Sequence, residues 1–248
     1  QIVARSRLRL TKVALAEERA AWLFLAPSLV LFAIFTAIPV ISAFFISFTQ
    51  WNLFNEVTWV GIGNYLGLAH DEIFAKVLGN TGYFVLVSVP VQIALALACA
   101  LALNRGLKGQ TFFRVVYSLP VVTSTIAAAL VWAWLFNSNF GLINAGLSLA
   151  GVTDLPKWMG STRWAMLAIF IVSIWQNLGY AMVLFLAGLQ NIGKDVHDAA
   201  ALDGATGWDR FWHITLPLLS PTTFFVLVIS IIGSFQLFEL VLVMTKAS

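Results

Sequence analysis

Five long stretches without a charged side chain dominate this sequence. They contain no Asp, Glu, Lys or Arg and cover residues 20–55, 77–104, 115–153, 164–193 and 211–238. A helix needs about 20 mostly apolar residues to cross a lipid bilayer, and each stretch is long enough to supply them. We therefore predict membrane-spanning helices near 22–48, 81–103, 113–136, 165–189 and 218–243.

The overall composition supports a membrane protein. Charged residues make up 10% of the chain, whereas a soluble domain carries about 25%. The predicted fold class is all-α, a polytopic bundle of transmembrane helices. Cys99 is the single cysteine, so an internal disulfide is excluded, and we interpret this side chain as a small apolar filler.

The N-terminal residues are basic and precede the first apolar stretch, as in a secretory signal peptide. The apolar run is far longer than the ~7–15 residues of a signal peptide, so we interpret it as an uncleaved first span. The predicted domains are a basic cytoplasmic segment, 1–21, and a transmembrane domain, 22–248.

The distribution of Lys and Arg predicts the orientation, because positive residues are retained on the cytoplasmic side of a membrane. A cytoplasmic N-terminus places four of these residues outside: Lys76, Lys157, Arg163 and Lys246. The same orientation places ten inside: Arg5, Arg7, Arg9, Lys12, Arg19, Arg105, Lys108, Arg114, Lys194 and Arg210. We predict a multi-pass protein of the cytoplasmic membrane. Because the basic residues flank the spans, the net charge of +3 does not indicate nucleic-acid binding.

Several kinds of site are missing from the sequence. Cys99 and the histidines (His70, His197 and His213) form no pattern of metal ligands, and no phosphate-binding loop is present. Glu239 is the one clear ionisable residue within a predicted span, whereas proton-coupled carriers use chains of such residues. We therefore expect this chain to bind no cofactor, and energy for uphill transport to come from another subunit.

A loop at about 193–216, cytoplasmic in this orientation, has its own predicted structure. Asp195 and Asp198 suit the start of a short helix, and Gly204 suits the left-handed residue that ends it. Thr206 starts a second short helix, and Pro217 bends the chain into the fifth span. An ordinary capped loop is one interpretation. However, isolated helices below about 12–15 residues are marginal in water, which favours docking against a partner through the small Ala199 and Ala200 side chains.

This loop resembles the cytoplasmic signature loop of permease subunits in binding-protein-dependent ABC importers. The family pattern is Glu-Ala-Ala, a later Gly and Ile-x-Leu-Pro. The matching residues are Asp198, Ala199, Ala200, Asp203, Gly204, Gly207 and 214–217, which ends at Pro217. Segments 47–55, 60–68, 78–84, 176–192 and 235–245 are similar to the sugar and glycerol-3-phosphate branch of the family. The sequence departs from the family in two ways: Asp198 replaces the glutamate, and a sixth span is expected.

The resemblance implies a mechanism and a set of partners. The helix at 195–204 would be a coupling helix seated on a cytoplasmic ATPase dimer, which would bind ATP and Mg²⁺. A second homologous permease would complete the channel, and an extracytoplasmic solute-binding protein would deliver the solute. This chain would be a non-catalytic subunit that translocates a sugar or a glycerol-phosphate-type solute.

Polar and small residues in the last two spans are candidates for the substrate path. Some of them match positions at which related permeases border their sugar, and others are polar at membrane depth or near the outer mouth. They are Asn177, Leu178, Gly179, Tyr180, Ser230, Gly233, Ser234, Gln236 and Glu239. Small residues at helical spacing also mediate helix packing in membranes, and Glu239 could instead serve a helix interface.

Two other functions remain open from the residues alone. A self-contained secondary carrier or channel predicts coupling carboxylates or broken helices at mid-membrane, and a membrane enzyme predicts a polar catalytic cluster. The sequence shows little of the first pattern and none of the second.

Overall fold

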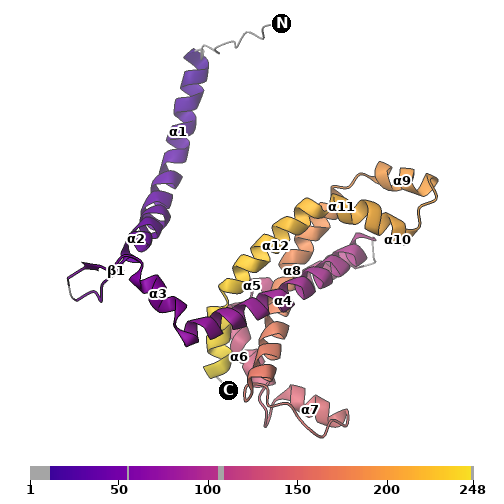
Figure 1. The fold of residues 1–248 in the computed structure, drawn as a ribbon. Coiled ribbons are helices and arrows are strands. Elements are labelled where there is room, and N and C mark those ends of the chain that lie inside the picture. Colours follow the sequence, from indigo (N-terminus) through magenta and orange to yellow (C-terminus); the bar gives the residue numbers. More distant parts are fainter. Residues whose placement is uncertain (1–11, 55, 106–108, 247–248) are drawn as a thin grey trace. The chain divides into compact units, whose positions relative to one another are not determined.

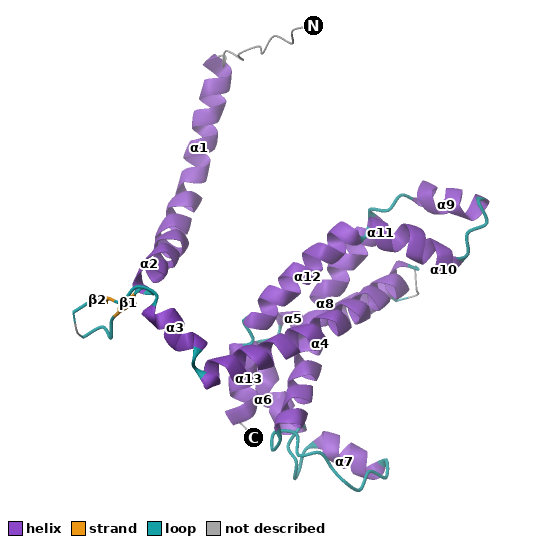
Figure 2. Cartoon of the chain, viewed as in Figure 1, coloured by secondary structure: helices purple, strands orange, loops and turns teal. Residues whose placement is uncertain are grey.

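The computed structural model describes residues 12–54, 56–105 and 109–246. Arg5, Arg7, Arg9 and Lys108, which contributed to the orientation argument, lie outside the described residues. The chain divides into two units, Gln1–Lys76 and Val77–Ser248. The described parts are almost entirely helical, and the strands β1 (Thr49–Gln50) and β2 (Thr58–Trp59) have two residues each (Figure 2).

The first unit contains the first predicted span. It is formed by α1 (Lys12–Phe32), a widened π-helical turn (Ala33–Ala37) and α2 (Ile38–Ile46), and residues Ala14–Ile46 are long and apolar enough to cross a membrane. The predicted span at 22–48 is thus confirmed, although α1 runs through the predicted domain boundary at 21–22. The chain then forms the antiparallel β1–β2 pair and α3 (Gly63–Ala69).

The second unit is built around long helices (Figure 1). The predicted spans at 81–103 and 165–189 lie within α4 (Glu72–Asn104) and α8 (Thr162–Gln190), and both helices pass the criteria for a membrane span. The remaining helices are α5 (Gln110–Val122), α6 (Thr125–Leu135), α7 (Leu142–Leu149), α9 (Lys194–Leu202), α10 (Gly207–Arg210), a π-helical turn (Phe211–Thr215), α11 (Leu216–Leu218), α12 (Ser220–Phe235) and α13 (Phe238–Lys246).

The third predicted span is broken. The prediction of one continuous helix over 113–136 is wrong, because α5 and α6 meet at an angle of 98°. Thr123 and Ser124 are extended, with ψ of 138° and 128°, and the Thr123 hydroxyl donates to the Leu119 carbonyl at 3.0 Å. Hydroxyl side chains offer the backbone such local alternatives to the helix, and here they accompany its end.

The fifth predicted span, 218–243, is also not one helix. It starts after a 64° bend between α11 and α12, where Pro217 and Pro221 flank Leu219, so the predicted proline bend is confirmed. The α12 helix ends at Phe235, and α13 begins after Gln236 and Leu237. These breaks explain why the structure offers three unbroken candidate spans, or five if each bent pair counts as one.

Two apolar cores hold the second unit together. One joins α4, α6, α8 and α13 through residues that include Phe84, Phe136 and Leu240. The other joins α4, α8 and α12 through residues that include Ala100, Phe185 and Val226. Along α8 the first core ends at Val172 and the second begins at Ala181. The interval between them carries Ser173, Gln176 and Asn177, so polar side chains separate the two cores.

Candidate functional site

The 193–216 loop forms a defined pair of turns at the end of the unit opposite α7 (Figure 1). Gly204 has φ of +78°, which confirms the predicted left-handed residue. The Gly204 N–H donates to the Ala201 carbonyl at 3.2 Å, and the Ala205 N–H donates to the Ala200 carbonyl at 3.0 Å. This pair of bonds is a Schellman motif, and it fixes the direction in which the chain leaves α9.

The predicted second helix start is confirmed at Thr206. The Thr206 hydroxyl accepts from the Asp209 N–H, and the Asp209 carboxylate accepts from the Thr206 N–H, each at 3.2 Å. This reciprocal pair is a capping box. Trp208, Phe211 and Trp212 then form a cluster with ring centroids 5.4–6.0 Å apart. The loop is therefore a structured element that carries an aromatic face.

Two details of the loop differ from the prediction. The cap of α9 is Gly193, without a side-chain hydrogen bond, and Asp195 lies in the first turn. The two alanines also do not face a partner together. Ala200 is buried within this chain, at 7% exposed, whereas Ala199 is exposed. The outward face of α9 instead includes Ala199 and the 89% exposed side chain of Leu202.

The second candidate region is a polar pocket between the two apolar cores. It has a volume of about 240 Å³, and its polar lining consists of Thr125, Gln176, Asn177, Gln236 and Glu239. Gly233 and the apolar side chains Val121, Leu237 and Leu240 complete it. Four of the predicted path residues thus line this pocket: Asn177, Gly233, Gln236 and Glu239.

The broken helix forms one wall of this pocket. The Gln176 side chain on α8 donates from Nε2 to the Thr125 hydroxyl at 3.1 Å and to the Thr123 carbonyl at 3.5 Å. Backbone that leaves a helix at membrane depth needs such partners, and it is tolerated where it is buried in protein or lines a cavity. Gln176 therefore ties α8 to the α5–α6 break beside the pocket.

Other predicted path residues take different positions. A Cβ added at Gly179 would lie 1.9 Å from the Tyr117 carbonyl oxygen, so this glycine permits close packing of α8 against α5. Ser234 donates to the Ser230 carbonyl within α12 at 2.8 Å and lines a different pocket, beside Phe84. Leu178 packs against the second core, and Tyr180 is 47% exposed. These residues do not join the polar lining around Glu239.

The sequence did not single out every residue of the pocket. Thr125 and the apolar Val121 and Leu240 were not predicted. The run Thr123-Ser124-Thr125 within an otherwise apolar segment is the feature that could have indicated the break and this wall of the pocket.

The fold and the pocket together define a multi-pass membrane protein with polar groups gathered at membrane depth. Residues 92–247 match the family of binding-protein-dependent transport system inner membrane components. The chain belongs to this family and is a multi-pass protein of the inner membrane.

Sequence relatives extend over most of the chain. It is 36% identical to a probable ABC transporter permease protein of Bacillus subtilis, over 88% of this chain and 76% of the relative. It is 34% identical to the lactose transport system permease protein of Rhizobium radiobacter, over 88% of this chain and 73% of the relative. It is also 34% identical to the trehalose/maltose transport system permease protein of Thermococcus litoralis, over 95% of this chain and 80% of the relative.

A solved structure shares the fold. It is a bacterial ABC transporter involved in the import of the acidic polysaccharide alginate. The TM-score is 0.74 at 24% identity, over 87% of this chain and 73% of that one. The all-α membrane fold class predicted from the sequence is thus confirmed. The family match and the sequence relatives show that the chain is a permease subunit of a binding-protein-dependent ABC transporter.

Proposed function

We propose that this permease translocates a sugar, with the polar pocket around Glu239 on the solute path. The observation that carries the proposal is the meeting of Gln176 and Asn177 on α8 with Gln236 and Glu239 at the α12–α13 junction. Amides and a carboxylate supply both donors and acceptors for hydroxyl groups. The relatives named for lactose and for trehalose/maltose transport support the same class of solute.

The charge of the pocket favours a neutral sugar over a glycerol-phosphate-type solute. Glu239 is the one formally charged residue in the lining, and no cation accompanies it there. A carboxylate repels an anion, and this repulsion strengthens as the local dielectric falls. We therefore infer a neutral mono- or oligosaccharide as the cargo.

The 193–216 loop supports a proposal for the ATPase partner. We propose that α9, Gly204 and the Thr206 cap form the coupling element that docks on a cytoplasmic ATPase dimer, which binds ATP and Mg²⁺. In this proposal Asp198, Ala199 and Asp203 lie on the docking side, and Gly207 and Pro217 set the path back to the membrane. A second permease and an extracytoplasmic solute-binding protein complete the importer. This subunit itself is non-catalytic.

Uptake into proteoliposomes tests the proposal. The transporter is purified with its partners from native membranes, and radiolabelled lactose, maltose and trehalose are supplied with the co-purified binding protein. We expect uptake of at least one sugar that requires ATP on the side of the ATPase. ATP-independent uptake by the chain alone would instead establish a carrier or channel.

The Glu239→Gln variant tests the pocket in the same assay. Removal of the charge should lower the sugar uptake at least severalfold, because a carboxylate is a stronger acceptor for sugar hydroxyls than an amide. Asp154→Asn is the matched control, since Asp154 is an exposed acid outside the pocket lining. Equal uptake by wild type and Glu239→Gln would remove Glu239 from the solute path.

A further inference from the structure

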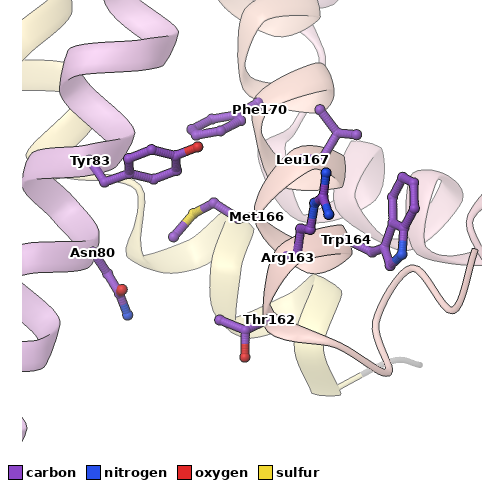
Figure 3. A pocket seen from close by; sticks show the side chains of 8 residues that line it. All are labelled: Asn80, Tyr83, Thr162, Arg163, Trp164, Met166, Leu167 and Phe170. Atoms are coloured by element: carbon purple, nitrogen blue, oxygen red, sulfur yellow. The ribbon is translucent and has the colours of Figure 1, made fainter.

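A second and larger pocket lies within the second unit, between α4 near Asn80 and Tyr83 and the start of α8 (Figure 3). Its volume is about 660 Å³. The polar part of its lining is Asn80, Thr162 and Arg163, and the apolar and aromatic part includes Tyr83, Met166 and Phe170. None of these residues lines the pocket around Glu239, so the two are separate sites.

The polar and the apolar residues of this pocket lie at different depths in the membrane. Asn80, Thr162 and Arg163 lie at the edges of the charge-free segments 77–104 and 164–193, where a spanning helix meets the headgroup region. Phe170 lies two turns further along α8, about 10 Å deeper at 1.5 Å per residue. Tyr83 and Phe170 approach each other across the pocket, with ring centroids 5.9 Å apart, and Figure 3 shows Met166 beside them. The pocket is therefore polar at the membrane boundary and apolar toward the membrane interior.

The polar end carries one positive charge. No carboxylate among the described residues forms an ion pair with Arg163, so its guanidinium remains available to an anion. Figure 3 shows the Arg163 side chain extended along α8 beside Leu167, as long cationic side chains do when the stem covers apolar surface. Trp164 follows directly, and tryptophan and tyrosine concentrate at headgroup depth.

We propose that this pocket binds an anionic phospholipid. The lipid phosphate would be held by Arg163, with Asn80 and Thr162 as hydrogen-bonding partners, and an acyl chain would lie against Met166 and Phe170. An amphiphile matches both ends of the pocket, whereas a soluble sugar or free phosphate would leave the apolar end uncovered. The inference does not depend on the nature of the transported solute.

Native mass spectrometry of the intact transporter tests this site. The complex is purified in mild detergent and equilibrated with equimolar phosphatidylglycerol and phosphatidylcholine. We expect wild type to retain phosphatidylglycerol preferentially, and Arg163→Gln to lower this preference about fivefold, since one basic residue near an anionic lipid surface contributes about a factor of five. Arg163→Lys should keep most of the preference, which guards against a variant that merely misfolds.

The matched control is Lys157→Gln, which removes the same charge from an exposed residue outside the pocket lining. It should leave the retained phosphatidylglycerol unchanged. An equal loss in both variants, or equal retention of the two lipids by wild type, would overturn the proposal. Displacement of the retained lipid by millimolar glycerol phosphate would also overturn it, because the site would then be one for a soluble anion.

Discussion

At the scale of single residues, Gly204 illustrates how one backbone conformation shapes a candidate docking element. Its φ of +78° is a left-handed value that costs other residues about 1 kcal/mol or more. The space around its Cα is open, with nothing within 4 Å of an added Cβ. A substitution at this position therefore tests the conformation of the backbone and not the packing of a side chain.

We predict that Gly204→Ala weakens retention of the ATPase subunit and lowers ATP-driven uptake severalfold, because the strained turn would redirect the end of α9. Gly204→Asn should recover much of the loss, since asparagine tolerates the left-handed region. Co-purification from native membranes, quantified by mass spectrometry, measures the retained ATPase.

Gly146→Ala on α7 is the matched control for this prediction, because it lies at the opposite end of the second unit from the coupling loop. Gly146 also has open space around it but no positive φ, so the same added methyl group should have little effect on the retained ATPase. If Gly204→Ala retained the ATPase as fully as Gly146→Ala does, the left-handed turn would have no part in docking.

At the scale of helices, the sequence predicted which segments are apolar better than it predicted where each helix stops. The charge-free stretches correctly indicated α4 and α8, because length and hydropathy alone determine whether a helix can cross a bilayer. The α5–α6 break was missed because Thr123 and Ser124 tolerate a helix as well as a turn. In the structure Gln176 bonds this segment from 53 positions away from Thr123, a contact that the local sequence does not indicate.

The candidate sites also differ in how far the sequence predicted them. Local motifs such as the Gly204 turn and the Thr206 cap were predictable, because their hydrogen bonds join residues close in sequence. The lining around Glu239 was only partly predictable, because it requires Thr125 from α6 to face residues from α8 and from the α12–α13 junction.

We predict that Gln176→Leu destabilises the break between α5 and α6. The substitution removes the amide that bonds the Thr123 carbonyl and the Thr125 hydroxyl, and a typical hydrogen bond contributes about 0.5–1.5 kcal/mol to stability. The thermal unfolding temperature of the purified complex should therefore fall. Asn177→Leu is the control, because the Asn177 amide bonds within its own helix, to the Ser173 carbonyl at 2.9 Å. Equal stability of the two variants would show that Gln176 does not hold the break.

At the scale of the whole molecule, the two apolar cores and the polar interval between them give the second unit a simple organisation. Apolar contacts near both ends of α8 hold this helix in place. The broken helices place polar side chains around the pocket between the two cores. Broken helices in a membrane protein are often associated with self-contained carriers. Here they occur in a permease of the binding-protein-dependent family, so a break by itself does not distinguish a carrier from a subunit driven by an ATPase.

The orientation of the molecule determines which partner each end can reach. The α7 segment and the α9–α10 loop lie at opposite ends of the second unit (Figure 1). The excess of Lys and Arg on the α9 side predicts that this side faces the cytoplasm, where an ATPase could dock. The α7 side would then face the solute-binding protein.

Cysteine labelling of intact cells tests this orientation. In a Cys99→Ala background, which removes the single native thiol, Lys157→Cys on the α7 side should react with a membrane-impermeant maleimide. Lys194→Cys, at the start of α9, should react only after the cells are opened. Both positions are exposed, so a difference between them reports the side of the membrane and not burial. The reverse pattern would place α9 outside the cell, and that result would exclude its docking on a cytoplasmic ATPase.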